Sequence, residues 1–168
     1  MNRVRDQLMV RRFLISIPLL VLLCTASWVR NALYVDEPTI WRDVITKTPN
    51  KSRVYNNLGA GLLNTGKLPE AAIAYERAIL LDPRNTDAVY GLAVAYYGMG
   101  RNREALSLYE RTLALDPGRR AAKRNVAMMY YESGQRDKAR REYESIIQMF
   151  PYSEEAVFAR KMLLMIGH

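Results

Sequence analysis

Apolar residues recur at helical spacing through most of residues 52–166, so the pattern predicts amphipathic helices. Glycines and prolines interrupt the pattern at regular intervals and divide it into pairs of helices. The expected pairs are Ser52–Gly66 with Pro69–Leu81, Asp87–Met99 with Arg103–Leu115, and Ala121–Ser133 with Asp137–Met149. One more helix is expected at Ser153–Ile166, with Ser153 as its N-cap, and a shorter one at Pro38–Lys47.

The helix pairs repeat with a period of 34 residues and no insertion, as in the step from Leu58 to Leu92 (92 − 58 = 34) and on to Val126. Further columns keep the same step. They are Gly59, Ala93 and Ala127; Gly66, Gly100 and Gly134; Ala71, Ala105 and Ala139; Tyr75, Tyr109 and Tyr143; and Pro83, Pro117 and Pro151. A fixed period of this length predicts an array of stacked helical units.

The small residues of the repeat have distinct expected roles. Gly66 and its two counterparts follow the first helix of each pair, where a left-handed C-cap favours glycine. Gly59 and its counterparts are expected to face Ala71 and its counterparts, so that the paired helices approach closely. Tyr75 and its counterparts then fill the space around them.

This pattern resembles the tetratricopeptide repeat (TPR) family over Ser52–Tyr152, in its period, its alternation of large and small residues and its proline after the second helix. The resemblance implies an all-α helical-hairpin solenoid with full repeats at 52–85, 86–119 and 120–152. Residues 153–168 are then a capping helix, and residues 30–51 a junction with a preceding half repeat. The family often has an aromatic residue early in the first helix. Lys123 stands there in the third repeat, so looser packing is expected beside it.

An uncharged apolar segment, Phe13–Val29, precedes the repeats. As a helix it is about 25 Å long at ~1.5 Å per residue, at the short end of what spans a bilayer. We expect a retained transmembrane helix. A cleavable signal peptide, with small residues at Cys24–Ser27, is the main alternative. A lipoprotein needs a small residue where Leu23 stands.

The charges around this segment predict its orientation. Residues 1–12 carry Arg3, Arg5, Arg11 and Arg12. After the apolar segment, Arg30 is the only basic residue before Trp41. The positive-inside rule then makes residues 1–12 a cytoplasmic tail and carries residues 31–168 across the membrane. In a bacterium, the repeats are then periplasmic and the chain is a single-pass inner-membrane protein. A cleaved signal peptide leads to the same compartment.

Composition removes several classes of function. The formal net charge is +8, but half of it lies in residues 1–30 (5 Arg − 1 Asp = 4), so the repeats do not indicate nucleic-acid binding. A single cysteine excludes an intrachain disulfide framework, and the one histidine is His168. The sequence shows no nucleophile–base set, phosphate-binding loop or Cys/His ligand set. We therefore expect no catalysis, no cofactor and no metal site.

Binding is the expected function, because the stacked first helices of such arrays line a concave groove. The TPR resemblance implies that this groove includes Arg53, Asn56, Asn57, Asn64, Tyr90, Tyr97, Arg124, Asn125, Met128 and Tyr131. Tyrosine and arginine are common hot-spot residues, and asparagine suits hydrogen bonds to a peptide backbone. For Tyr97 and Tyr131, packing between repeats is an equally open interpretation.

Two patterns known in the family are incomplete in this chain. The lysine, asparagine and arginine clamp for a terminal carboxylate is not reproduced. The asparagine ladder of TPRs in some protein glycosyltransferases keeps Asn57 and Asn125 but is broken by Gly91.

The main hypothesis is a membrane-anchored scaffold that binds a protein or peptide in its groove. The junction Trp28–Gly59 is similar to the last-span-to-TPR junction of multi-span glycosyltransferase-like membrane proteins, so an accessory module of such a system is the alternative. Self-association through Met162, Leu163 and Met165 is a weaker one. The basic run Arg119–Arg124 is either a contact for anionic lipid or an acidic partner, or a solvated helix surface.

Overall fold

The computed structural model describes residues 38–167. The expected basic tail (1–12), the apolar segment (13–29) and the first part of the junction (30–37) lie outside the described residues, as does His168. Every regular element in the described range is a helix, which confirms the prediction of an all-α fold. The helices are α2 (Pro38–Lys47), α3 (Ser52–Asn64), α4 (Leu68–Leu81), α5 (Thr86–Gly98), α6 (Asn102–Leu115), α7 (Arg120–Glu132), α8 (Arg136–Met149) and α9 (Glu154–Ile166). Within this range, none of the helices is long and apolar enough to cross a membrane.

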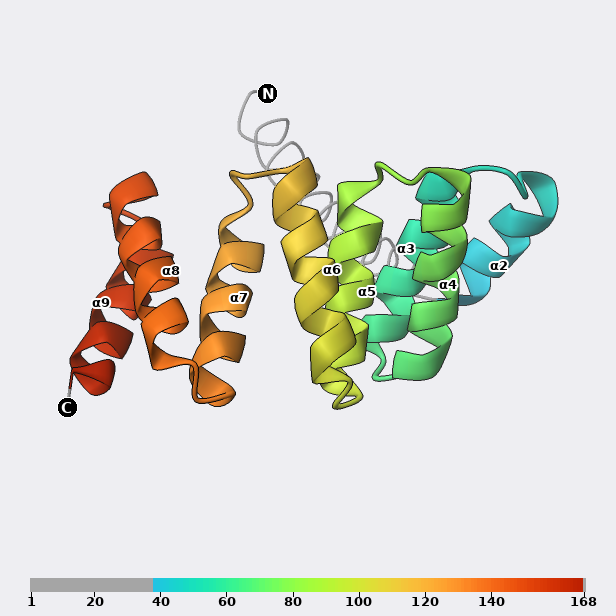
Figure 1. Cartoon of the computed structure of the whole chain (residues 1–168). Coiled ribbons are helices and arrows are strands. Elements are labelled where there is room, and N and C mark those ends of the chain that lie inside the picture. The colour runs from blue at the N-terminus through green and yellow to red at the C-terminus, as the bar shows by residue number, and fades with distance from the viewer. Residues whose placement is uncertain (1–37, 168) are drawn as a thin grey trace, which may run out of the picture.

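The helices stack side by side as a two-layered array (Figure 1). α3, α5, α7 and α9 form one layer, and α4, α6 and α8 form the other. The hairpins α3–α4, α5–α6 and α7–α8 pack in sequence, with α2 against α3 and α9 against α8. This is the helical solenoid that the repeat pattern predicts.

The first helix of each hairpin ends in the same left-handed glycine turn. Gly66, Gly100 and Gly134 have φ values of 75°, 75° and 74°. After α3, the Lys67 N–H donates to the Leu62 carbonyl at 2.9 Å, while the Gly66 N–H donates to the Leu63 carbonyl at 3.0 Å. These two bonds define a Schellman motif, so the predicted glycine C-caps are confirmed.

A short chain of hydrogen bonds ties the loop before α5 to the first hairpin. The Asn85 side chain accepts the backbone N–H of Ala88 at 3.0 Å and thereby caps α5. Asn85 Nδ2 donates to Ser52 Oγ at 2.8 Å, and Ser52 Oγ donates to the Ala78 carbonyl at 2.8 Å. The start of α3, the end of α4 and the start of α5 are therefore held together. Ser153 caps α9 as predicted, since its Oγ accepts the Ala156 N–H at 3.1 Å.

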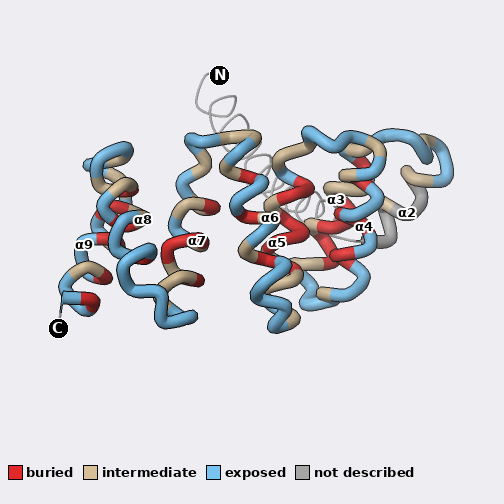
Figure 2. Tube along the Cα trace, viewed as in Figure 1, coloured by how far each residue is buried: buried red, intermediate tan, exposed pale blue. Residues whose placement is uncertain are grey.

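The core runs between the two layers along the whole array (Figure 2). Alanines and one tyrosine from each second helix pack against apolar residues of the first helices. Tyr75, Tyr109 and Tyr143 are all buried. Burial raises the pKa of the Tyr75 and Tyr143 hydroxyls to about 12, because a phenolate loses its hydration there.

The partner of Gly59 differs from the expected one. The three atoms nearest to a Cβ built at Gly59 all belong to the ring of Tyr75, with Cε1 at 2.8 Å, whereas Ala71 was expected there. The same ring extends to the next repeat, where a Cβ at Gly91 would overlap it. Tyr75 of α4 is thus inserted between α3 and α5. Glycine in both helices leaves the room that the ring needs.

Lys123 occupies the position early in the first helix of the third repeat where the family often has an aromatic residue. Its side chain is only 14% exposed, and Nζ lies 3.5 Å from Glu142 Oε2 of α8. The aliphatic stem packs while the ammonium group pairs with the carboxylate. At this point an ion pair joins α7 to α8. The looser packing expected beside Lys123 stays a prediction.

Candidate partner-binding face

The predicted binding residues lie on α3, α5 and α7, in the layer of first helices, and helical spacing puts those of each helix on one side of it. We call this side the first-helix face and define it by Arg53, Asn56, Asn57 and Asn64 of α3, Tyr90 and Tyr97 of α5, and Arg124, Asn125, Met128 and Tyr131 of α7. Arg53, Asn64 and Arg124 are exposed, and the others are half-buried. None of these residues is fully buried.

Polar contacts across the helices bring the residues of α5 and α7 together. Asn125 Nδ2 donates to the Tyr90 hydroxyl at 3.4 Å. Tyr97 Oη donates to Glu132 of α7, 3.0 Å from Oε1 and 3.1 Å from Oε2. This hydrogen bond raises the pKa of the Tyr97 hydroxyl, because the neutral phenol is the form that donates to the carboxylate. Both pairs link a tyrosine of α5 to a side chain of α7.

Besides its hydrogen bond with Asn125, Tyr90 makes two contacts through its ring. The guanidinium carbon of Arg119 lies 4.5 Å from its ring centroid, a cation–π geometry. Arg119 Nη1 in turn lies 2.6 Å from Asp87 Oδ1. On the other side, the ring of Tyr109 is tilted by 56° with centroids 5.7 Å apart. These contacts restrain the Tyr90 ring on the first-helix face.

The asparagines of α3 form the polar end of the face. Asn56 Nδ2 lies 3.5 Å from Asn57 Oδ1, which is a long hydrogen bond. Among the described residues, no hydrogen bond joins Asn56, Asn57 or Asn64 to α5. Each amide carries two donors and an acceptor, so this end of the face can pair with backbone groups of a peptide.

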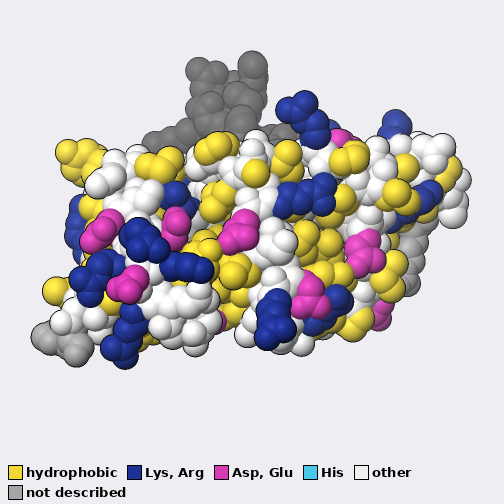
Figure 3. All heavy atoms as spheres, in the orientation of Figure 1, with side chains coloured by type: hydrophobic (Ala, Val, Ile, Leu, Met, Phe, Trp, Pro, Cys, Tyr) yellow, Lys and Arg dark blue, Asp and Glu magenta, His cyan; other side chains and the backbone are white. Residues whose placement is uncertain are grey.

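Most of the basic run Arg119–Arg124 is neutralised within the fold. Arg119 pairs with Asp87, Arg120 Nη1 lies 3.5 Å from Glu155 Oε2, and Lys123 pairs with Glu142. Figure 3 shows acidic and basic side chains interspersed over the end of the array that holds α8 and α9. The arrangement favours the solvated, ion-paired surface among the two interpretations of this run.

Tyr97 and Tyr131 belong to the packing between repeats as well as to the face. Tyr97 packs against the buried cluster of α5, α6 and α7 that includes Tyr109 and Met129. Tyr131 packs against the cluster of α7, α8 and α9 that includes Tyr143 and Met162. Since both rings remain half-buried, the two interpretations apply to the same side chains.

Sequence reasoning missed three residues of this region. Arg119 and Glu132 were not among the predicted binding residues, yet they hold Tyr90 and Tyr97. Gly91 was interpreted only as a gap in an asparagine ladder, whereas it makes room for the Tyr75 ring. A signal was present, because Tyr90–Asn125 and Tyr97–Glu132 share a separation of 35 residues, one more than the period. In the range 38–167, no group of three or more His, Cys, Asp or Glu is placed to hold a metal ion.

Comparisons with known proteins agree with this architecture. The family model described as tetratricopeptide repeat matches residues 62–124 and 97–157, hence 62–157 together. No curated protein matches the chain.

Solved structures share the fold. A crystal structure of MamA is 24% identical with a TM-score of 0.64, over 68% of this chain and 67% of that one. The first TPR of Spaghetti (RPAP3), bound to the HSP90 peptide SRMEEVD, is 23% identical with a TM-score of 0.63, over 70% of this chain and 90% of that one. The Arabidopsis OM64 TPR domain is 18% identical with a TM-score of 0.61, over 67% of this chain and 93% of that one.

Proposed function

Because the chain belongs to the tetratricopeptide repeat family, we propose that it is a non-catalytic scaffold that binds an extended segment of a partner protein on its first-helix face. The observation that carries the proposal is the pair of contacts Tyr90–Asn125 and Tyr97–Glu132, which preorganises half-buried aromatic and amide groups on adjacent helices. Preorganised side chains lose little entropy on binding and so favour affinity.

The chemistry of the face suits an extended polypeptide. Tyr90 and Tyr97 offer rigid, amphipathic contact area, and Arg124 of α7 is an exposed cation. The α3 asparagines supply donors and acceptors for backbone groups. A neighbour of the same fold was solved with a bound peptide, which supports an array of this kind as a peptide receptor.

A displayed library of random short peptides tests this function. Peptides selected on the wild-type protein are expected to bind the double variant Tyr90→Ala/Arg124→Ala at least about tenfold more weakly, since two hot-spot side chains are lost. A second pair, Arg53→Ala/Asn64→Ala, removes only exposed groups and keeps the test valid if the first pair unfolds. The control is Ile73→Ala/Leu80→Ala on α4, where both side chains are also exposed. Equal loss in the control, or no loss in either face variant, would contradict the proposal.

We further propose that Phe13–Val29 anchors the chain in the bacterial inner membrane and that the repeats are periplasmic. The support is the uncharged apolar segment and the excess of arginines before it. An alkaline phosphatase fused after His168 is expected to be active, and a fluorescent protein that folds only in the cytoplasm is expected to stay dark. The reverse result would invert the topology. Mass spectrometry of the mature chain separates the alternatives, because a cleaved signal peptide leaves a shorter protein free of the membrane.

A narrower version of this function is an accessory module of a membrane glycosyltransferase or envelope assembly system. It rests on the similarity of the Trp28–Gly59 junction to such proteins. Crosslinking in intact membranes is expected to capture a multi-span protein that lacks TPRs of its own. Capture of soluble periplasmic proteins alone would remove this version and leave the scaffold function standing.

A further inference from the structure

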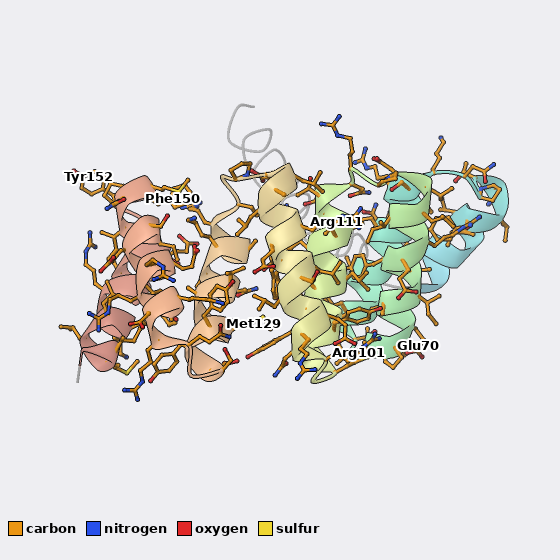
Figure 4. All side chains as sticks on the ribbon, viewed as in Figure 1. Glu70, Arg101, Arg111, Met129, Phe150 and Tyr152 are labelled. Carbon is orange, nitrogen blue, oxygen red and sulfur yellow. The ribbon has the colours of Figure 1, made fainter. Side chains whose placement is uncertain are left out.

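A pocket of about 250 Å³ opens between the second and third repeats, at the start of α6 and the end of α7. Leu106 and the buried Met129 line its apolar part, while Asn102, Arg103, Glu132 and Gln135 are exposed around it. Figure 4 shows Met129 between α6 and α7. The pocket is therefore an apolar recess with a polar rim.

The interface between the first and second repeats shows which side chain fills the corresponding place there. One period earlier, Asn102 corresponds to Leu68 (102 − 34 = 68) and Glu132 corresponds to Gly98 (132 − 34 = 98). At that first junction, a Cβ built at Gly98 would lie 2.9 Å from Leu68 Cδ1, so the leucine side chain packs onto the end of α5. Between the second and third repeats, the shorter amide side chain of Asn102 stands in place of this leucine. The space is left open above Leu106 and Met129.

The size and the rim limit the ligand. Pockets for whole small molecules usually measure roughly 300–1,000 Å³, so a volume of about 250 Å³ suits a single side chain better. Arg103 and Glu132 give the rim one charge of each sign, and Asn102 and Gln135 offer amides. Such a rim matches the dipoles of a peptide backbone on either side of an uncharged side chain.

The pocket adjoins the first-helix face through one residue pair. Glu132 stands on the rim, and Tyr97 of the face donates its hydroxyl hydrogen to both carboxylate oxygens of Glu132. Tyr97 of the first-helix face thus contacts a residue that lines the pocket.

We propose that this pocket anchors one leucine-sized apolar side chain of the extended partner segment that the first-helix face binds. The bound side chain takes the place that Leu68 takes at the first junction, and the flexible Met129 adapts to its shape. This inference rests on the proposed function and adds to it the position and the type of the anchoring residue.

Asn102→Leu tests the proposal, because it places in the pocket a leucine that corresponds to Leu68 between the first and second repeats. The probes are the peptides selected from the random library on the wild-type protein. They are expected to share one Leu, Ile, Met or Phe, and to bind Asn102→Leu at least about tenfold more weakly, the loss that corresponds to leaving such a side chain exposed. The control is Arg136→Leu, which introduces a leucine one period later (102 + 34 = 136) and outside the pocket. Replacing the shared apolar residue of a peptide by alanine is expected to cost as much as Asn102→Leu, with no further loss when both changes are combined.

If the peptides bind Tyr90→Ala/Arg124→Ala more weakly but bind Asn102→Leu as tightly as the wild type, the pocket does not anchor them. That result would overturn this inference and leave the proposed function standing. Failure to select any peptide would overturn both. Concentration-dependent dimerisation of the wild type that Asn102→Leu abolishes, seen by light scattering, would place a second copy in the pocket and overturn the assignment to a partner. Asn102 is exposed, so the variant is expected to fold, and its thermal melting is measured alongside.

Discussion

The ring of Tyr75 in α4 lies against the backbone of Gly91 in α5. Its counterparts meet different residues in the same column, since Asn125 stands one period after Gly91 (91 + 34 = 125) and Ala159 one period later still. The repeat position that Gly91 occupies therefore holds glycine, then asparagine, then alanine along the array. Among these three positions, only Gly91 lacks a Cβ.

Gly91→Ala is expected to destabilise the protein because its new Cβ overlaps the Tyr75 ring, which is buried and cannot move away. Overpacking of this kind costs about 1–3 kcal/mol, against which alanine gains about 0.5–1 kcal/mol in helix propensity. The matched control is Gly98→Ala on the same helix, where the Cβ meets only the end of the flexible Leu68 side chain. Urea denaturation of both variants measures the difference. Equal stability of the two variants would refute the packing of Tyr75 into α5.

Gly100→Ala is expected to cost about 1–2 kcal/mol for a different reason, because a Cβ is strained at the φ of 75° that this residue adopts. No atom lies within 4 Å of the added Cβ, so the cost is purely conformational. Gly100→Asn is expected to lose less, since asparagine tolerates the left-handed region better than alanine. Chemical denaturation separates the two variants, and an alanine variant as stable as the wild type would contradict the Schellman turn.

The repeat period predicts the solenoid, the glycine caps and the Ser153 cap because each depends on local sequence or on identity between repeats. The contacts of the face depend on side chains that differ between repeats. Nothing in the pattern around Asp87 indicates that Arg119 pairs with it, since the neighbouring repeats have no such pair at these positions. The pocket shows the same limit. It is created by the exchange of Leu68 for Asn102, and only the packing shows that such an exchange leaves a space.

Alkaline pH is expected to destabilise the protein through its buried tyrosines. The pKa of Tyr75 and Tyr143 is raised to about 12 in the folded state, whereas an unfolded tyrosine ionises near ~10. Their stabilising contribution is complete below about pH 10 and is lost as the pH rises through about 12, because only the unfolded chain then releases the protons.

Tyr143→Phe is expected to reduce this alkaline loss. Tyr143 Oη is buried and has no hydrogen-bond partner among the described residues. Its removal is therefore expected to raise the free energy of unfolding near neutral pH by about 1 kcal/mol. Urea midpoints at about pH 8 and about pH 11 measure the difference. Tyr152→Phe is the control because Tyr152 is fully exposed. A variant of Tyr143 that loses as much stability as the wild type between the two pH values would contradict this account.

Tyr130 of α7 and Glu110 of α6 form a contact that recurs one period earlier. Tyr130 Oη donates to Glu110 Oε1 at 2.8 Å, as Tyr96 Oη does to Glu76 Oε1 at 2.6 Å. The hydrogen bond to Glu110 is the largest cause that raises the pKa of Tyr130 to about 12, because it stabilises the neutral phenol and the carboxylate repels a phenolate.

Glu110→Gln is therefore expected to lower the pKa of Tyr130 towards its ordinary value of ~10. Ultraviolet titration measures the change, and the transition that disappears in Tyr130→Phe identifies the residue. In the capping helix α9, Leu164 stands one period after Tyr130 (130 + 34 = 164), so Glu144 of the third repeat has no tyrosine at this position. Glu144→Gln is therefore the matched control and is expected to leave the titration of Tyr130 unchanged. Glu110 is exposed, so a double-mutant cycle is expected to give a coupling of only about 0.2–1 kcal/mol. A pKa of Tyr130 that stays near 12 in Glu110→Gln would show that burial beside α6, and not the carboxylate, controls its ionisation.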